Sequence, residues 1–373
     1  MDWEAEGLLE GLSGKERDAR ISLLELLIAE GFELQDIKRA HGEGELMFLL
    51  TSRSIDVTTQ YTWDELLEKV GLPQELVERL IRAQGLARAE GDEVIYGDAD
   101  VEMLQTTGRF IEAGVSEDDV LAIGRLLGRG FSQAAEVMRS SAMRMVLEPG
   151  LDERELAVRY AHVAGALTPM VEPLLGSLLK LHLSKMVQTE IISAEEREAG
   201  RLPGARDITV AFADLVGFTR LGEEVPPDEL GAVAGRLESI VLELIEPPVR
   251  FIKTIGDAVM VISPDPEPLL DTTLRLVDAA DAEGEHFPQL RSGLACGKAL
   301  SRGGDWFGHP VNLASRVTTI AYAGSVLATD DVQEKAPGAY RWSKAGIRRL
   351  KGIDEAVPLW RARRLEAESG EPA

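Results

Sequence analysis

An asparagine and an arginine lie four residues apart in the segment DWFGHPVNLASR (305–316). Pro310 suits the first turn of a helix, and on a helix Asn312 and Arg316 share one face. An amide can orient an oxygen while a guanidinium neutralises a phosphoryl group. The pair therefore predicts an anion site. The alternative is an ordinary polar surface at the start of a helix.

Two aspartates at the ends of predicted strands could hold metal ions. Asp214 follows an apolar strand, and Asp257 lies in the Gly-Asp turn of a predicted hairpin over 249–263. Two carboxylates at adjacent strand ends suit a pair of hard divalent cations bound against phosphates. Gly217 would let backbone N–H groups approach those phosphates closely. Taken singly, each aspartate also fits an ordinary turn.

The elements that must position these residues make up the second half of the chain. We predict strands at 206–212, 249–254, 258–263, 291–299, 325–329 and within 340–360, and helices at 226–245, 266–284 and 310–322. This βαββαβ order predicts a ferredoxin-like α/β (α+β) domain with a mostly antiparallel sheet.

The first half is predicted to be all-α. We expect helices at 14–30, 62–70, 73–84, 98–113, 116–128 and 132–148, and another from 152 that Pro169 and Pro173 end or kink. A helix over 174–199 carries a broad apolar stripe and enters the short linker 200–204. We favour a partner-facing helix that transmits movement over an internal core helix. The predicted domains are a regulatory domain (1–173), a transducing helix and linker (174–204), a catalytic domain (205–365) and a disordered tail (366–373).

The composition excludes several classes of protein. The 373 residues carry 40 basic and 64 acidic side chains, a net charge of −24 that argues against nucleic-acid binding. One cysteine, Cys296, excludes an intrachain disulfide framework and fits a reducing compartment. No apolar run approaches the roughly 20 residues that span a bilayer, and the acidic N-terminus is unlike a signal peptide. We predict a cytoplasmic protein with no transmembrane segment.

A segment from Tyr61 to Asp100 resembles the opening of MerR-type regulators, with a helix-turn-helix pair. Residues 61–127 carry fifteen acidic and six basic side chains, however. A DNA reader needs lysine and arginine toward phosphate, so the scaffold is expected without the DNA-binding function.

From Asp214 to Lys351 the second half resembles the class III nucleotidyl cyclases. The resemblance implies two Mg²⁺ or Mn²⁺ ions on Asp214 and Asp257, joined by the backbone carbonyl of Leu215. It also implies base selection by Lys253 and Asp305. The remaining implied roles are ribose orientation and transition-state stabilisation by Asn312 and Arg316, and phosphate binding by Gly217, Phe218, Thr219 and Lys351.

The choice of base also follows from hydrogen-bonding chemistry. Adenine offers an N1 acceptor and an N6 amino donor, which Lys253 and Asp305 complement. Guanine presents O6 and N1–H, so the same pair would face mismatched groups at a cost of several kcal/mol. Cys296 precedes the Asp305 position and is expected to be a core residue. We therefore predict ATP as the substrate and 3′,5′-cyclic AMP and pyrophosphate as products.

The family resemblance further implies a head-to-tail homodimer with two shared sites. The metal aspartates would come from one subunit and the base, ribose and polyphosphate groups from the other. The run Gly303-Gly304-Asp305-Trp306-Phe307 looks like the GGDEF signature of diguanylate cyclases, but those enzymes lack the Asn312–Arg316 pattern.

The first half resembles, less specifically, the N-terminal halves of mycobacterial cyclases of a pH-responsive type. This implies an autoinhibitory domain that responds to acidity or to a fatty acid. Histidine is the side chain that titrates near neutrality, and His162, His182 and His309 are candidate sensors, although each also fits an ordinary surface position. The competing functions are a catalytically silent nucleotide-binding regulator and a one-component transcription factor.

Overall fold

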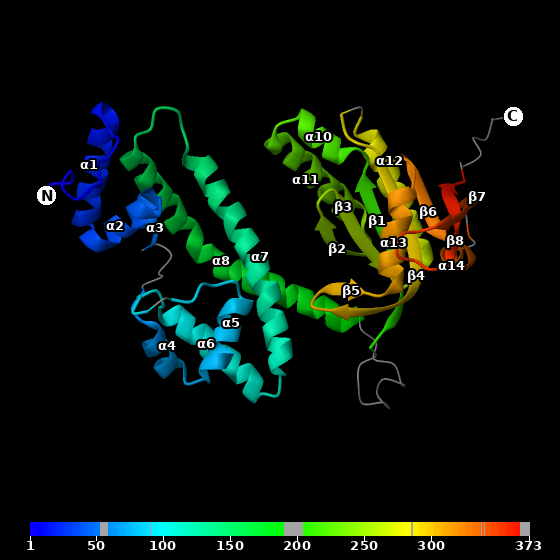
Figure 1. Ribbon diagram of the computed structural model, residues 1–373, viewed down its shortest axis with the longest axis horizontal. Coiled ribbons are helices and arrows are strands. Elements are labelled where there is room, and N and C mark those ends of the chain that lie inside the picture. The colour runs from blue at the N-terminus through cyan, green and yellow to red at the C-terminus, as the bar shows by residue number, and fades with distance from the viewer. Residues whose placement is uncertain are drawn as a thin grey trace. The chain divides into compact units, whose positions relative to one another are not determined.

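The computed structural model describes residues 1–52, 59–89, 91–189, 204–284, 286–336, 338 and 340–365. The chain divides into two compact units, Met1–Ile192 and Ser193–Ala373, and each is described by itself (Figure 1). Most of the predicted linker 200–204 and the whole predicted tail 366–373 lie outside the described residues.

The first unit is built from helices. In chain order they are α1 (Gly14–Ala29), α2 (Leu34–Gly42), the 3₁₀ turn η1 (Leu46–Phe48), α3 (Leu49–Ser52), α4 (Trp63–Val70), α5 (Gln74–Ala83), α6 (Asp98–Glu112), α7 (Glu117–Val146) and α8 (Glu153–Thr189). Local sequence sets several of these boundaries. Thr62 and Glu65 form a capping box at the start of α4, and Gly71 ends that helix in the left-handed conformation at φ 69°.

Two predicted helix ends, one near Gly128 and one at Pro169 and Pro173, are wrong. Residues 117–146 form one helix through Gly128, because that glycine packs against the backbone of Gln84: a Cβ there would lie 2.2 Å from the Gln84 carbonyl oxygen. The glycine therefore allows α7 to pack closely against the end of α5. Likewise α8 continues through Pro169 and Pro173, so the helix expected to begin at Leu174 is the second half of α8. Each proline removes one backbone hydrogen bond, but the turns on either side remain helical.

Helices α4 and α5 form as predicted and are joined by a short turn. Their side chains build one core with α6 and the start of α7. Nothing in this pair confirms the likeness to MerR-type regulators.

A separate core joins the N-terminal helices to the beginning of α8. Leu23, Leu24 and Leu27 of α1 pack with Ile37 of α2 and with Ala157 of α8, which is fully buried. Phe48 of η1 meets Tyr160 of α8 edge to face, with ring centroids 5.1 Å apart. The first turns of α8 are therefore held by the N-terminal helices.

The second unit is a sheet covered by helices on both faces. Its elements are β1 (Arg206–Leu215), α10 (Phe218–Glu224), α11 (Pro227–Leu244), β2 (Arg250–Ile255), β3 (Ala258–Ser263), α12 (Pro266–Ala282), β4 (Leu290–Arg302), β5 (Asp305–Phe307), α13 (His309–Ile320), β6 (Ser325–Thr329), α14 (Asp330–Lys335), β7 (Tyr340–Arg349) and β8 (Ala356–Arg364). Among the described residues the strands form one eight-stranded sheet, in the order β2-β3-β1-β4-β6-β8-β7 with β5 paired to β4. The β4–β6 pair is parallel and the other pairs are antiparallel. The predicted ferredoxin-like, mostly antiparallel arrangement is confirmed.

Strand β1 shows why the sequence folds this way. Its alternate residues point to opposite faces, as the period of a strand requires. Ala211, Ala213 and Leu215 pack with α11 and α12, whereas Val210 and Phe212 pack with α13. The expected core position of Cys296 is confirmed, since Cys296 is 7% exposed on β4 among the α11 and α12 residues.

A glycine on β4 seats α13 against the sheet. A Cβ at Gly293 would lie 2.3 Å from the backbone nitrogen of Thr318, so the helix rests directly on the strand. The Thr318 hydroxyl also donates to the carbonyl of Phe212, at 3.3 Å. These contacts fix the height of α13 above the sheet. In the described part of the chain, no helix has both the length and the apolar character needed to cross a membrane.

Candidate active site

The two aspartates predicted to bind metal lie beside each other at one end of the sheet. Asp214 is the penultimate residue of β1 and pairs with Ala258 of β3 on one side and with Arg291 of β4 on the other. Asp257 lies in the turn between β2 and β3, where Gly256 has a φ of 63°. The Leu215 N–H donates to the carbonyl oxygen of Asp257 at 3.1 Å, which ties the two strand ends together.

The arrangement of these carboxylates suits a cation. Burial raises the pKa of Asp257 above its ordinary value, and the nearby negative charge of Asp214 raises it further. Two carboxylates at neighbouring strand ends, one of them destabilised as an anion, are stabilised by a positive charge between them. Carboxylate and carbonyl oxygens are also the donors that Mg²⁺ and Mn²⁺ accept, so these residues fit such ions.

Arg291 is a residue of this site that the sequence reasoning missed. Its Nε and Nη2 donate to Asp214 Oδ2 at 2.8 and 2.5 Å, and its Nη1 donates to the Thr319 carbonyl of α13 at 3.1 Å. The signal was the antiparallel pairing of β1 with β4, which places Arg291 directly opposite Asp214. Arg291 therefore connects the acidic strand end to the last turn of α13.

The predicted base-selecting pair is brought together within one chain. Lys253 of β2 and Asp305 of β5 form an ion pair through Nζ and Oδ2. The second oxygen of Asp305 accepts from the backbone N–H of Trp306 at 2.8 Å, which orients the carboxylate. The side chains remain 37% and 29% exposed, so both heads are accessible to a ligand. The pair presents one donor and one acceptor side by side.

Asn312 and Arg316 lie on the exposed face of α13, as their spacing predicted. Leu313, Ala314 and Val317 turn toward the sheet and are buried. Pro310 lies in the first turn of the helix, as predicted. Within the described residues, neither the Asn312 nor the Arg316 side chain has a hydrogen bond or an ion pair. Both heads are therefore free for a ligand.

The predicted phosphate-binding positions lie in two turns. Gly217 adopts the left-handed conformation, at φ 79°, and precedes the short helix α10 that begins at Phe218. Phe218 packs against the core, which leaves Thr219 exposed. Lys351 is exposed in the turn after β7, next to buried Leu350. The structure does not bring the side chains of Lys351, Asn312 or Arg316 into contact with the aspartates of the same chain.

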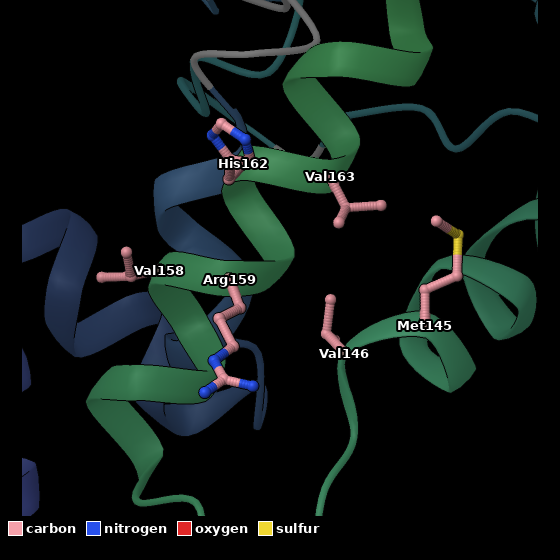
Figure 2. Close-up of a pocket in the computed structure, with 6 residues that line it drawn as sticks. All are labelled: Met145, Val146, Val158, Arg159, His162 and Val163. Carbon is pink, nitrogen blue, oxygen red and sulfur yellow. The ribbon is translucent and has the colours of Figure 1, made fainter.

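The three candidate sensor histidines are all exposed. His182 lies on the second half of α8, and His309 is the first residue of α13. His162 lies on α8 at the edge of a hollow of about 390 Å³ whose lining includes Met145, Val146 and Val163 (Figure 2). In the described part of the chain, the three imidazoles have no hydrogen bond or ion pair.

Comparison with known families accounts for both units. The profile of the adenylate cyclase regulatory domain matches residues 1–187, and that of the adenylate and guanylate cyclase catalytic domain matches residues 202–360. The chain belongs to the class III adenylate cyclases. The helical first unit is thus the regulatory domain of an adenylate cyclase.

The chain is similar to adenylate cyclases from several bacteria. It is 44% identical to the pH-sensitive adenylate cyclase of Mycobacterium tuberculosis, over 99% of this chain and 94% of that protein. It is 31% identical to an adenylate cyclase of Streptomyces coelicolor, over 77% of this chain and 74% of that protein. Among solved structures, an adenylyl cyclase from P. aeruginosa matches with a TM-score of 0.39 and 21% identity, covering 44% of this chain and 98% of that one.

Proposed function

We propose that this cyclase converts ATP into 3′,5′-cyclic AMP and pyrophosphate at sites shared by two subunits. The observation that carries the choice of ATP is the Lys253–Asp305 pair, held side by side with both heads accessible. An ammonium donor and a carboxylate acceptor complement N1 and the N6 amino group of adenine. Guanine would leave the carboxylate facing O6, which disfavours it.

Asp214 and Asp257, with the Leu215 carbonyl, would hold two Mg²⁺ or Mn²⁺ ions. Such ions, when bound, would lower the pKa of the ribose 3′-hydroxyl and neutralise the triphosphate. The 3′-oxygen then forms a bond to the α-phosphorus as its proton passes to solvent water, and the bond between the α-phosphorus and the β-phosphate oxygen breaks to release pyrophosphate.

The other residues act by orientation and by charge. The Asn312 amide orients the ribose, and the Arg316 guanidinium meets negative charge that grows on the α-phosphoryl group in the transition state. Lys351 meets the polyphosphate, and the turn at Gly217, Phe218 and Thr219 offers backbone N–H groups to it.

The orientation of α13 supports a shared site. Leu313 and Val317 face the sheet, so Asn312 and Arg316 point away from the surface on which their own chain carries Asp214. An outward-facing amide and guanidinium can contact a nucleotide that is held by the aspartates of a second copy in a head-to-tail dimer. The second half of α8 supports association as well, since it exposes a run of leucines. These are Leu174, Leu178, Leu179, Leu181 and Leu183, each 49–62% exposed.

The activity is tested with purified protein, ATP or GTP, and Mn²⁺, followed by separation of linear and cyclic nucleotides. We expect cyclic AMP from ATP, little product from GTP, and loss of product when EDTA removes the metal. A well-folded preparation that yields only linear nucleotide would overturn the proposal.

Shared sites are tested by mixing two inactive variants. Asp257→Ala chains retain the nucleotide groups and Lys253→Ala chains retain the aspartates, so a mixed dimer has one intact site. We expect the mixture to recover activity, with each variant alone as the control. The absence of recovery in a mixture that demonstrably exchanges subunits would contradict shared sites.

We also propose that the regulatory domain restrains the catalytic domain and makes the activity respond to pH, as the name of the mycobacterial relative states for that protein. The transducing segment 174–204 would carry the response to the catalytic domain 205–365. An activity profile of the wild-type protein between pH 5.5 and 8 tests this, and an unchanged turnover across that range would refute it.

A fatty acid is a second proposed effector. The hollow between α7 and α8 has walls of methionine and valine, with Arg159 and His162 also lining it (Figure 2). An alkyl chain with a carboxylate suits that combination. We expect a long-chain fatty acid to change the activity, and Val163→Asp to abolish the effect; an equal response in both proteins would exclude this hollow.

A further inference from the structure

A partly buried arginine connects three segments of the regulatory domain. Arg20 of α1 donates from Nε to Glu153 Oε2 at 2.6 Å and from Nη1 to the Leu8 carbonyl at 3.3 Å. The same Nη1 lies 3.2 Å from Nδ1 of His41, on α2. The side chains of Arg20 and Glu153 are only 16% and 25% exposed. We call Arg20, His41 and Glu153 the N-terminal clamp.

The contact between Arg20 and His41 defines the protonation state of the imidazole. A guanidinium has only donors, so Nδ1 of His41 must accept and must carry no proton. With Nδ1 as the acceptor, the imidazole carries its one proton on Nε2. Protonation of Nδ1 would remove the acceptor and would set two cations at hydrogen-bonding distance in a largely buried place.

Within the described residues, no carboxylate forms a hydrogen bond or an ion pair with His41, so none offsets that repulsion directly. On α2 itself, Lys38 is paired with Glu6 and Arg39 with Asp36. On the side of α1, Arg17 is paired with Glu4. The described residues of η1 and α3, 46–52, include no charged side chain. Glu153 of α8, the acidic member of the clamp, is already paired with Arg20.

The N-terminal clamp contacts the first residue of α8, the helix that leads to the catalytic unit. Glu153 is the first residue of α8, and Ala157, one turn later, is buried in the core of the N-terminal helices. Helix α8 continues to Thr189, the last residue described before the catalytic unit. A change in how α1 and α2 hold this first turn acts at one end of a long helix.

We propose that His41 is a proton switch: its protonation breaks the contact with Arg20 and loosens α1 and α2 from the first turn of α8. The site needs no ligand other than a proton. This inference rests on the proposed pH response of the enzyme, because it names the group that senses acidity.

Hydrogen exchange on the full-length protein tests the switch without reference to catalysis. Exchange of peptides from α1, α2 and the start of α8 is compared at pH 7.5 and pH 5.5, with labelling times scaled for the intrinsic pH dependence. We expect about tenfold faster corrected exchange at pH 5.5, the effect of losing one hydrogen bond to a charged group. His41→Gln keeps an acceptor for Arg20 that does not titrate, so its corrected exchange should be the same at both pH values. His182→Gln is the matched control and should behave as wild type.

The outcomes separate this proposal from the proposed function. An acid-induced increase that persists in His41→Gln, or that is absent from the wild-type protein, overturns the switch. A wild-type protein that shows the increase but has a flat activity profile supports the switch and refutes the proposed pH response. Glu153→Ala provides a second variant: it removes the carboxylate that accepts from Arg20 at both pH values, so exchange should already be fast at pH 7.5, and slow exchange there would also overturn the clamp.

Discussion

Replacement of Arg316 by alanine should strongly lower turnover and leave folding intact. Arg316 is exposed on α13, and in the described structure its side chain has no hydrogen bond or ion pair. Exposed substitutions of this kind change the free energy of unfolding by less than about 0.5 kcal/mol. Loss of one donor aimed at developing negative charge costs about 2.7–4 kcal/mol of transition-state stabilisation, or roughly 100- to 1,000-fold in kcat.

The assay measures kcat and KM for ATP with Mn²⁺ in the Arg316→Ala variant, together with its melting temperature. Because the interaction strengthens only in the transition state, kcat should fall while KM for ATP changes little. Arg341→Ala is a matched control, since Arg341 is exposed on β7 and belongs to no predicted site. Arg316→Lys should recover part of the rate, because it keeps the charge without the planar fork.

Two results would refute this reasoning. A rise in KM with unchanged kcat would mean that Arg316 binds substrate and transition state equally. A melting temperature several degrees lower, matched by loss of activity, would mean that the side chain supports the fold, contrary to its exposure.

Two further predictions concern the seat of α13 and the choice of base. Gly293→Ala should lower the free energy of unfolding by about 1–3 kcal/mol because its Cβ would meet the backbone of α13; in the control Gly231→Ala the Cβ meets open space within a helix, so urea unfolding should show no loss. Lys253→Ala leaves the Asp305 carboxylate without its ion-pair partner, so the preference for ATP over GTP should fall about tenfold or more; an unchanged ratio of kcat/KM for the two nucleotides would remove this pair from base selection.

The sheet could be predicted from the sequence because its pattern is local. In β1 most residues on both faces are apolar, and Asp214 and Gly217 mark the end of the strand. The spacing of Asn312 and Arg316 was equally informative, since a helix of known start fixes which residues share a face. The short elements α10, α14 and β5 were not predicted, because three to seven residues give too little periodicity.

The wrong helix boundaries have a tertiary cause. Glycine within a helical pattern indicates a break only if no neighbour needs the space. At Gly128 the backbone of Gln84 occupies the place of a side chain, and the two residues are far apart in the sequence. A helix-propensity scale assigns a value to each residue by itself and therefore cannot account for that contact. Helix α8 is a different case, because its 37 residues continue through Pro169 and Pro173, where the sequence predicted an end or a kink from the local effect of proline alone.

Arg291 could not be found as a site residue from spacing alone. It lies 77 positions after Asp214, and only the register of β1 with β4 brings the two side chains together. A shift of that register by one residue would place Arg291 on the other face of the sheet. Pairings of this kind depend on the assembled sheet, whereas the residues near a strand end can be recognised beforehand.

Within the described residues, the candidate sensor histidines differ from His41 in that His41 has a hydrogen bond to a charged side chain and they do not. His162, His182 and His309 were singled out because they lie near the junction or near the catalytic helix, yet all three are exposed. An exposed imidazole without a partner gains a proton with little effect on structure, because water solvates each protonation state equally well in every conformation of the protein. A sensor needs a partner whose interaction differs between the two states, since only that difference moves an equilibrium. His41 has such a partner in Arg20, and Arg20 holds the first residue of α8, so the effect of one proton reaches the helix that leads to the catalytic unit.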